Sequence, residues 1–484
     1  MPAERTDVEL VIPVVLLVIE YGIKIVALGV IPENRRPSSS SAWLLLIFFL
    51  PVVGLPLFFL IGSPYVAGRR QKVQRQANAV IRRGFSPQGT EGLEIPTDLV
   101  SLTRMNQKLT EFPVMAGETV GFHADYEESI ASIVAAIDSA ESFVHLEMYI
   151  LALDSTTEPL FAALAAAVKR NVEVRVLYDH LGSRKYVGHR EMNARLTADG
   201  VDWRRMMPID LLRGRWRRPD LRNHRKLVVI DGVRAFMGSQ NMIDSSYLSK
   251  RNRRTGRHWI DLNIELTGAI VTSLDAVFRV DWYVETGEAV EITGDPHAGE
   301  TTTGMQLVPS GPGYPSEPNL RLFCSMIADA RERVVIVSPY FVPDEALQSV
   351  ITTASYRGVE VELFVSEKAD QFMVHHAQRS YYESLLTAGV RIWTYPDPAT
   401  LHTKFMIVDG RVAMIGSSNM DMRSFALDYE ITLLGFDDRF IAGLDDIAAR
   451  YRDVCSELTV EKWGKRKWHE RYLDNVLRLT AAVQ

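Results

Sequence analysis

Apolar positions near the N-terminus form two long stretches, at residues 10–31 and 43–62. Each stretch is long enough to cross the roughly 30 Å hydrocarbon core of a bilayer as a helix. We therefore predict an N-terminal two-helix transmembrane hairpin in a multi-pass membrane protein. Pro51 and Pro56 predict a bend in the second helix, because a membrane helix tolerates proline with a kink. A pair of buried helices in a soluble protein is the alternative.

Beyond about residue 115 the pattern changes to short apolar runs that alternate with amphipathic helical stretches. The same order occurs twice: runs 143–150 and 172–179 flank one helix, and runs 333–340 and 359–365 flank another. Strands alternating with helices predict an α/β fold in which mixed, largely parallel β-sheets are flanked by helices. The predicted parts are the hairpin at 1–68, a basic juxtamembrane linker at 69–114, and two similar domains at 115–290 and 291–484, the last with a C-terminal amphipathic segment.

Each domain contains a stretch that predicts a β-hairpin. The first runs from His224 to Asn241 and the second from His402 to Asn419, and both have the form His-x-Lys-x4-Asp-Gly followed by Gly-Ser-x-Asn. An Asp-Gly pair between apolar runs is a strong signal for a two-residue hairpin turn. Such a turn makes the motif histidine face the motif serine across the hairpin.

Side chains alternate along a strand, so residues two apart share one face. The predicted turns place His224 opposite Ser239 and His402 opposite Ser417. The lysine and asparagine of each copy lie two positions further along and share that face. One imidazole, one ammonium, one hydroxyl and one amide are therefore expected to converge in each copy.

The motif His-x-Lys-x4-Asp followed by Gly-Ser-x-Asn, present twice, resembles the phospholipase D superfamily. Further stretches narrow the resemblance to bacterial cardiolipin synthases: Leu221-Arg-Asn-His-Arg-Lys, Trp259-Ile-Asp-Leu, Ser310-Gly-Pro-Gly, Pro339-Tyr-Phe-Val-Pro and Asn419-Met-Asp-Met-Arg-Ser. The resemblance covers nearly the whole chain, including its apolar start. It implies two phospholipase D-like domains packed around a shared cleft, with one active site built from both motifs.

The resemblance also implies the chemistry. The residues that match the catalytic motif of the family are His224, Lys226, Asp231, His402, Lys404 and Asp409. It implies a covalent phosphohistidine intermediate, with His224 as the nucleophile and His402 as the acid that protonates the leaving glycerol; the sequence itself does not rank the two. Asp231 and Asp409 belong to the family motif, but they lie at the hairpin turns, about five residues and roughly 16 Å from the lysines. We interpret both aspartates as turn or scaffold residues.

Further polar residues of the two motifs are expected to complete the site. Together with the lysines, Ser239, Asn241, Ser417 and Asn419 supply donors to the nonbridging oxygens of a phosphodiester, where charge changes during displacement. Each histidine also needs a partner on its other ring nitrogen, which fixes its tautomer and orientation. By the spacing of the family, Glu430 orients His402 and Asp261 orients His224, with Glu265 as the rival of Asp261.

The formal net charge of −6 argues against a nucleic-acid-binding protein, which usually presents a basic face. Basic residues are nevertheless concentrated in three segments: 69–83, 203–222 and 250–257. The first has six basic residues and no acid, which by the positive-inside rule places it and the catalytic domains in the cytoplasm. The other two are candidates for holding anionic lipid headgroups, and a solvated basic surface is the alternative. The candidate contacts are Arg215, Arg217 and Arg218.

Neither a metal nor a cofactor is predicted. Cys324 and Cys455 fit no metal-ligand spacing, and the lysines can supply the positive charge that a metal would otherwise provide. Residues 462–479 mix tryptophan, leucine and basic residues, so this C-terminal segment is expected either to lie on the bilayer surface or to pack on the domain.

By this resemblance, the chain is expected to be a phosphatidyltransferase of the bacterial plasma membrane that converts two phosphatidylglycerol molecules into cardiolipin and glycerol. The alternatives are a hydrolytic phospholipase D, a phosphatidyltransferase with another alcohol acceptor, a nuclease, and a catalytically silent lipid-binding scaffold. The membrane hairpin disfavours the nuclease, and the complete His, Lys, Ser and Asn sets disfavour the scaffold. The oligomeric state stays open.

Overall fold

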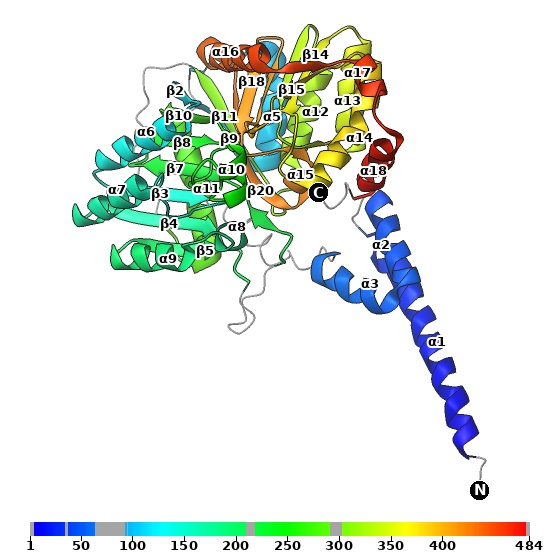
Figure 1. Cartoon of the computed structure of the whole chain (residues 1–484). Coiled ribbons are helices and arrows are strands. Elements are labelled where there is room, and N and C mark those ends of the chain that lie inside the picture. The colour runs from blue at the N-terminus through cyan, green and yellow to red at the C-terminus, as the bar shows by residue number, and fades with distance from the viewer. Residues whose placement is uncertain are drawn as a thin grey trace. The chain divides into compact units, whose positions relative to one another are not determined.

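The computed structural model describes residues 4–33, 37–62, 92–93, 95–209, 218–290 and 303–480 (Figure 1). The chain divides into two compact units. One comprises residues 1–68 together with 218–220, and the other comprises 69–217 and 221–484. The first unit is built around the apolar N-terminal segments, and the second contains both His-x-Lys motifs.

The N-terminal unit is helical. It contains α1 (Glu4–Val30), α2 (Pro37–Phe49), α3 (Pro51–Leu57) and the π-helical turn η1 (Phe58–Gly62). Within α1, residues Ile12–Val30 form a helix long and apolar enough to cross a membrane, whereas the apolar helices Ser39–Phe49 and Pro51–Leu60 are shorter. The helix breaks at Leu50, whose φ of −136° and ψ of 65° are not helical, because a residue that precedes proline is sterically pushed out of the helical region. The predicted bend is therefore present, and the second membrane span stays a prediction.

The helices of this unit pack through a small apolar core of Ala27, Ile31, Ile47 and Phe58. Gly54 permits the close approach of α3 to α2, because a Cβ atom there would lie 2.9 Å from the backbone of Ile47. By contrast, most large apolar side chains of α1 from Ile12 onward are exposed. An apolar helix with an exposed surface of this kind is suited to a lipid environment.

The first half of the larger unit forms a seven-stranded sheet in the order β2-β10-β8-β7-β3-β4-β5. Strands β3, β4 and β5 are parallel, and the remaining neighbours are antiparallel. The strands are β2 (Glu118–His123), β3 (Phe143–Met148), β4 (Glu173–Asp179), β5 (Asp202–Met206), β7 (Lys226–Ile230), β8 (Arg234–Gly238) and β10 (Asn263–Thr267).

The second half repeats this order in the series β11-β20-β18-β17-β12-β14-β15. Its strands are β11 (Gly304–Ser310), β12 (Arg333–Val337), β14 (Glu360–Ser366), β15 (Arg391–Tyr395), β17 (Phe405–Val408), β18 (Val412–Gly416) and β20 (Asp428–Gly435). Two edge strands extend this sheet: β1 (Val114–Ala116) pairs with β11, and β21 (Ser456–Leu458) pairs with β15. The predicted internal repeat and the mixed, helix-flanked sheets are thus confirmed. The expectation that the sheets are largely parallel is wrong, because each motif hairpin and the strands beside it pair in the antiparallel sense.

The chain enters the larger unit through its second half. Leu99 and Leu102, at the start of α5 (Val100–Thr110), are buried in the core of the second half, and β1 is an edge strand of the second sheet. The described end of the predicted linker at 69–114 is therefore an integral part of that half. The basic run at 69–83 lies outside the described residues.

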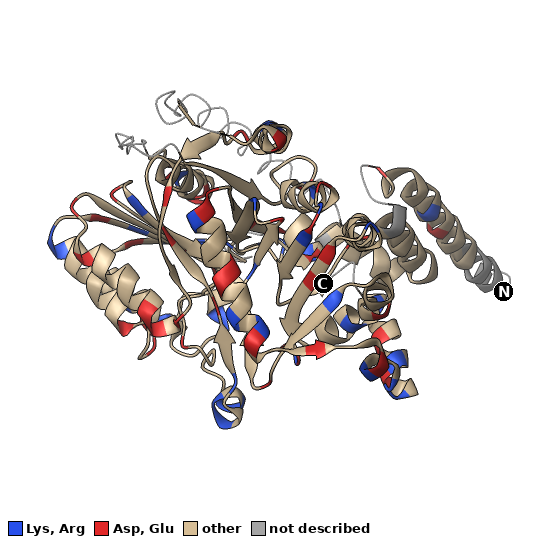
Figure 2. Cartoon of the chain, turned by 90° about the horizontal axis from the view of Figure 1, so that it is seen from above, with Lys and Arg blue, Asp and Glu red and all other residues tan. Residues whose placement is uncertain are grey.

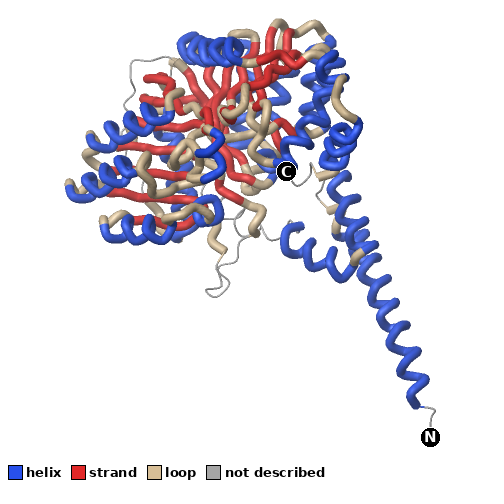
Figure 3. Tube along the Cα trace, in the orientation of Figure 1, coloured by secondary structure: helices blue, strands red, loops and turns tan. Residues whose placement is uncertain are grey.

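Helices cover the outer faces of both sheets, while the strands gather in the middle of the larger unit (Figure 3). A continuous apolar core fills the space between the two sheets, and α11 (Ile270–Thr286) and α16 (Asp438–Val454) contribute to it. Acidic and basic residues are interspersed in the view from above (Figure 2). The long helices are α6 (Tyr126–Asp138), α7 (Glu158–Lys169), α9 (His189–Ala198), α11 (Ile270–Thr286), α12 (Pro318–Ala328), α13 (Glu345–Tyr356), α14 (Phe372–Ala388) and α16 (Asp438–Val454).

Candidate active site

Both predicted hairpins form, but their turns are one residue longer than expected. Ile230 pairs with Arg234 across the β7–β8 hairpin, and Val408 pairs with Val412 across the β17–β18 hairpin. Each turn therefore contains three residues, beginning with the Asp-Gly pair. The predicted facing of His224 with Ser239, and of His402 with Ser417, is wrong, because it assumed a two-residue turn.

The turn aspartates bind the chain that precedes the central strand of each half. The carboxylate of Asp231 accepts hydrogen bonds from the backbone N–H groups of residues 141, 142 and 143 at 2.7–2.8 Å. Asp409 makes the same three bonds to residues 331, 332 and 333 at 2.8–2.9 Å. Burial raises the pKa of Asp409, but the three backbone donors outweigh it and hold this pKa below its usual range. The geometry agrees with a scaffold role for both aspartates.

The segment that leads to each histidine crosses to the other half. The short strand β6 (Arg222–Asn223) pairs in parallel with the start of β20, and the backbone N–H of His224 donates to the carbonyl of Tyr429 at 2.9 Å. In the same way, β16 (Ala399–Leu401) pairs with β9 (His258–Ile260), and the N–H of His402 donates to the carbonyl of Ile260 at 2.8 Å. Each motif is therefore held by the opposite half, and the two motifs lie in one site.

The orienting carboxylates are exchanged relative to the prediction. Nδ1 of His224 lies 3.0 and 3.1 Å from the carboxylate oxygens of Glu430, and Nδ1 of His402 lies 2.7 Å from Asp261. The prediction that each half orients its own histidine is wrong, because sequence spacing does not reveal the crossed strands. Glu265 instead pairs with His123 at 3.2 Å, so it is not the orienting residue. Within the described residues, no hydrogen bond uses Nε2 of His224 or His402, which leaves this atom for a substrate.

The motif serines hold these carboxylates. The hydroxyl of Ser239 donates to Asp261 at 2.6 Å, and the hydroxyl of Ser417 donates to Glu430 at 2.5 Å. The prediction that the serine hydroxyls bind substrate phosphate is therefore corrected: in this geometry each hydroxyl donates to a carboxylate. Ser424 adds a third bond, to Glu430 at 2.7 Å, and was missed although it ends the quoted Asn-Met-Asp-Met-Arg-Ser stretch.

The glycine of each Gly-Ser pair allows this contact. A Cβ atom at Gly238 would lie 2.2 Å from the carbonyl oxygen of Leu262, and one at Gly416 would lie 2.2 Å from that of Ile431. Only a residue without a side chain permits the neighbouring strand to approach so closely. The glycine thus sets the separation between each motif serine and the segment that carries its carboxylate partner.

The two motif lysines are buried beside the histidines. Nζ of Lys226 donates to the carbonyl of His224 at 2.6 Å, and Nζ of Lys404 donates to the carbonyl of His402. Burial lowers the pKa of Lys226 to about 8 and that of Lys404 to about 7. An anionic phosphate placed between them would favour their charged forms, since opposite charges raise the pKa of an ammonium.

The motif asparagines differ in their contacts. Asn241 donates to the Tyr247 hydroxyl at 2.8 Å and accepts from the backbone N–H of Ile150 at 3.2 Å, so much of its amide is already engaged. Among the residues that the structure describes, Oδ1 of the buried Asn419 has no hydrogen-bond partner. That both asparagines bind phosphate therefore stays a prediction. The amide of Asn241 is already engaged on both its oxygen and its nitrogen, whereas within the described part of the chain the oxygen of Asn419 is not.

The electrostatic environments of the histidines are unequal. Burial, and then the charges of Lys226 and Lys404, hold the pKa of His224 well below its usual range. Burial and Lys404 also lower the pKa of His402, but Asp261 opposes them. Burial acts to raise the pKa of Asp261, yet His402 outweighs it and this pKa is lowered. Burial raises the pKa of Glu430 to about 7, against the opposing charge of Lys226. At neutral pH, His402 thus has an ionised partner and is better able to carry a proton than His224.

Arg225, the middle residue of the first His-x-Lys, links the site to α11. Its Nε donates to the backbone carbonyl of Glu430 at 3.1 Å, and its guanidinium forms a buried ion pair with Asp281. The middle residue of the second motif, Thr403, donates to the carbonyl of Ile260 at 3.2 Å. Sequence reasoning missed both residues, because the crossed strands bring Glu430 and Ile260 near and Asp281 lies 56 residues further along the chain, on α11.

The predicted headgroup contacts are only partly described. Arg215 and Arg217 lie outside the described residues. Arg218 is buried and pairs with Asp220 at 2.5 Å. The second basic insert forms the short helix α10 (Lys250–Thr255), whose residues are largely exposed. The assignment of these arginines to lipid binding therefore stays a prediction.

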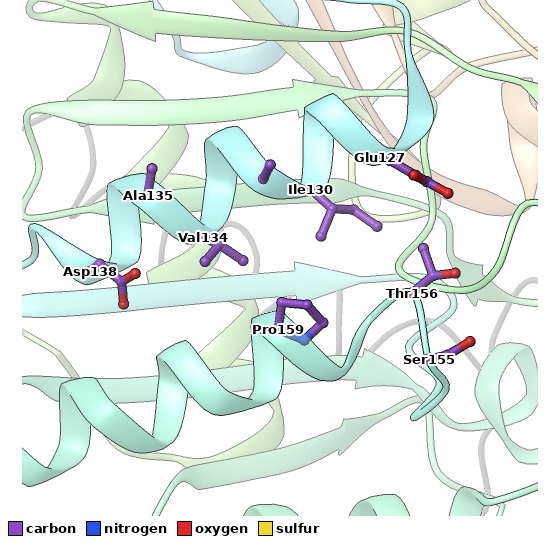
Figure 4. A pocket seen from close by; sticks show the side chains of 9 residues that line it. Glu127, Ile130, Val134, Ala135, Asp138, Ser155, Thr156 and Pro159 are labelled. Atoms are coloured by element: carbon purple, nitrogen blue, oxygen red, sulfur yellow. The ribbon is translucent and has the colours of Figure 1, made fainter.

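A groove of about 520 Å³ lies between α6 and α7 and is shown in Figure 4. Its walls come from Ile130, Val134, Asp138, Thr156 and Pro159 among others. None of the motif histidines, lysines, serines or asparagines lines it. This groove is separate from the candidate active site.

Comparison with known proteins gives consistent matches. A family model described as cardiolipin synthase, PLD-like domain, matches residues 133–282 and 323–452, and one described as phospholipase D-nuclease N-terminal matches residues 23–63. Cardiolipin synthase A of Proteus mirabilis (strain HI4320) is 32% identical over 465 residues, which cover 92% of each chain. Cardiolipin synthase of Geobacillus kaustophilus (strain HTA426) is 33% identical over 472 residues, covering 95% of this chain and 91% of that protein.

Among solved structures, phosphatidylserine synthase of Haemophilus influenzae Rd KW20 is similar to this chain, with a TM-score of 0.58 and 18% identity. The match covers 79% of this chain and 98% of that one. At this identity the likeness concerns the fold alone, and it agrees with the duplicated arrangement of the two sheets.

Proposed function

Because this chain belongs to the cardiolipin synthase family of proteins with phospholipase D-like domains, we propose that it transfers a phosphatidyl group from one phosphatidylglycerol to another, producing cardiolipin and glycerol. The observation that carries the mechanism is the crossed pairing of His224 with Glu430 and of His402 with Asp261. It supplies two oriented imidazoles in one site, and a two-step transfer needs one nucleophile and one acid.

In the first step, Nε2 of His224 attacks the phosphorus of phosphatidylglycerol. Its Nδ1 is engaged by Glu430, which holds the attacking nitrogen in the correct tautomer and stabilises the developing positive charge. His402 donates its proton to the glycerol oxygen as the P–O bond breaks, and a phosphatidyl group remains on His224. The ammonium groups of Lys226 and Lys404 stabilise the negative charge on the nonbridging oxygens.

In the second step, a hydroxyl of a second phosphatidylglycerol replaces the glycerol. His402, now neutral, accepts the proton of this hydroxyl while its oxygen attacks phosphorus, and the P–N bond to His224 breaks. Cardiolipin leaves, and both histidines return to their starting protonation states. The unequal environments of the histidines support this assignment, because His224 is the more strongly held in its neutral, nucleophilic form.

The intermediate is testable with phosphatidylglycerol labelled in its phosphate. Wild-type protein should retain label after rapid denaturation in alkali, under which phosphohistidine is stable, and His224→Ala should not. If label is retained by His224→Ala and lost in His402→Ala, the roles are reversed. Absence of label from both wild-type protein and variants would contradict a covalent route.

A hydrolytic phospholipase D differs only in the second acceptor, which would be water. Synthesis therefore requires that the second lipid headgroup be held while water is excluded. We propose that Arg215, Arg217 and Arg218 contribute to holding it, as the basic insert adjoins the first motif in the sequence. Purified protein incubated with phosphatidylglycerol alone should yield cardiolipin and glycerol with little phosphatidic acid. Replacing the three arginines by glutamine should raise the share of phosphatidic acid.

We also propose a multi-pass arrangement in the plasma membrane, in which α1 and the segment 43–62 form a hairpin and the catalytic unit faces the cytoplasm. Support comes from the spanning length of Ile12–Val30 and from the apolar character of the segment after it. The six basic residues at 69–83 support the cytoplasmic orientation.

A further inference from the structure

The C-terminal helix α18 (Trp468–Arg478) presents an exposed apolar stripe. Trp468 is 78% exposed, Tyr472 66% and Val476 39%, and Leu479, which caps the helix, is 84% exposed. These positions are four, four and three residues apart, so they follow one face of the helix. An aromatic and aliphatic row of this kind is unusual at the end of a soluble domain, where single exposed apolar residues are the norm.

The opposite face of α18 is fixed to the domain by charge. Asp474 is 1% exposed and accepts from His376 at 2.7 Å, from Arg466 at 3.1 Å and from Arg379 at 3.3 Å. Arg379 also pairs with Glu470 at 3.2 Å, one turn earlier on α18. His376 and Arg379 belong to α14, beside which α18 lies in Figure 1. Near the end of α18, Arg478 lies over the ring of Tyr381 of α14.

This docking differs from the usual arrangement of an amphipathic helix. A surface helix normally buries its apolar stripe against the core and exposes its charges. Here the buried Asp474 faces the domain beside the partly buried Leu473 and Leu477, while the apolar stripe faces outward. The contacts with the domain thus leave this stripe available to a membrane.

The charges that remain exposed around the stripe are basic. Lys465 and Lys467 are exposed just before the helix, and Arg471 within it is exposed as well, whereas Arg478 lies over the Tyr381 ring of α14. Both acidic residues of α18, Glu470 and Asp474, are paired with arginine. Tryptophan and tyrosine combine an apolar ring with a polar group and favour the boundary between lipid and water, and nearby basic residues attract anionic headgroups.

We propose that α18 is a membrane-docking helix, whose stripe of Trp468, Tyr472, Val476 and Leu479 inserts into the interface of a bilayer that contains anionic lipid. The proposal concerns how the catalytic unit meets the bilayer, and it stands independently of the reaction that the unit performs.

The test uses the full-length protein reconstituted into vesicles of phosphatidylglycerol and phosphatidylcholine. Cys324 and Cys455 are replaced by alanine, and a spin label is attached at Tyr472→Cys or at Val476→Cys. A matched control carries the label at Tyr356→Cys, since Tyr356 is 70% exposed at the end of α13. Labels at 472 and 476 should be more accessible to oxygen than to a water-soluble nickel chelate, and the label at 356 should show the reverse.

Two outcomes would overturn the proposal. The first is that labels at 472 and 476 are as accessible to the nickel chelate as the label at 356. The second is strong spin–spin broadening at 472 that persists in detergent, which would show that a second copy of the chain covers the stripe. Vesicles of phosphatidylcholine alone should reduce the oxygen preference at 472, and an unchanged preference would contradict the role of anionic lipid. All three readouts are independent of catalytic activity.

Discussion

Nδ1 of His402 lies 2.7 Å from Oδ1 of Asp261, a carboxylate that precedes it by 141 residues and belongs to the other half of the chain. The converse pair, His224 with Glu430, spans 206 residues. Each half therefore supplies one histidine and the carboxylate that orients the other half's histidine. A defect in either half should disturb both chemical roles.

The crossed pairing predicts that Asp261→Asn and Glu430→Gln impair different steps. Each should lower the rate by about 10²–10⁴-fold, the usual contribution of oriented acid–base groups. With an activated phosphodiester whose leaving group needs no proton, Asp261→Asn should recover much of its rate, because it impairs the acid His402. Glu430→Gln should stay slow, because it impairs the nucleophile His224. Initial rates with both substrates provide the measurement.

Glu265→Gln is the matched control, since Glu265 pairs with His123 and is also a largely buried carboxylate. It should keep near wild-type rates with both substrates. Recovery of Glu430→Gln in place of Asp261→Asn would mean that the acid and nucleophile roles are the reverse of those proposed.

The turn aspartates should affect stability rather than chemistry. Asp231→Asn and Asp409→Asn each weaken three hydrogen bonds to a carboxylate, and should lower the free energy of unfolding by about 1–3 kcal/mol. The rate per folded molecule should change little. Thermal unfolding in detergent, combined with kcat on active-site-titrated protein, measures both quantities. Asp138→Asn, at the exposed end of α6, is the control and should change neither.

The lowered pKa of Asp409 adds a pH signature to this variant. A carboxyl group whose folded pKa lies below its unfolded value stabilises the fold above the unfolded pKa, and this stabilisation is lost as the pH falls through the folded pKa. The stability gap between wild type and Asp409→Asn should therefore narrow in acid. A gap that is constant down to the folded pKa would rule out the charged carboxylate as its source.

The activity should have a narrow pH optimum near neutrality. Below about 7 Glu430 gains a proton and no longer supports positive charge on His224, so the rate should fall as the pH decreases. Above about 7 Lys404 loses its proton and no longer stabilises the phosphate, so the rate should fall as the pH increases. The pH profile of kcat/KM in mixed micelles reports these groups in the free enzyme. Glu430→Gln should lose the acid limb and keep the alkaline one; retention of the acid limb would assign it to another group.

Membrane topology can be tested with an impermeant thiol reagent on intact cells. In a background without Cys324 and Cys455, a cysteine at Glu33 should react from outside, since this exposed residue follows α1. Ser40 is a poorer choice because it is 4% exposed. A cysteine at Val187, which is 84% exposed in the catalytic unit, should react only after the cells are permeabilised. The opposite pattern would place the active site on the outer face.

Much of the fold follows from the sequence because periodicity and the duplicated motif are local signals. The two hairpins, the repeat of β3 and β4 in β12 and β14, and the apolar N-terminal helices were all predictable in this way. The hairpin register was missed by one residue, because the Asp-Gly pair was assumed to form a two-residue turn. In the structure the carboxylate of Asp231 instead binds three backbone N–H groups of another loop. That contact joins residues up to 90 positions apart, so no local sequence pattern predicts it.

The sequence predicts which residues form the site, but not which histidine pairs with which carboxylate. The histidines, lysines, Asp261 and Glu430 were identified from motif spacing, whereas their pairing depends on β6 and β16, two very short strands that cross between halves. The sequence predicts the serines as phosphate ligands because a hydroxyl suits that task equally well. Their bonds to carboxylates follow from the close strand approach at Gly238 and Gly416.

The pairing of β1 with β11 also constrains the order of synthesis. Val114 pairs with Gln306, which leaves the ribosome about 190 residues later, or on the order of 10–40 s at ordinary elongation rates. Through that interval α5 lacks its partners α12 and β11 and β1 lacks its strand partner, although α11 of the first half, which also packs against β1, emerges earlier. Apolar residues such as Phe112 and Met115, which are buried in the finished protein, must meanwhile be shielded by other means. A nascent chain arrested before residue 303 would therefore carry α5 without its partners in the second half and β1 with one edge unpaired, which makes this segment a natural binding site for chaperones.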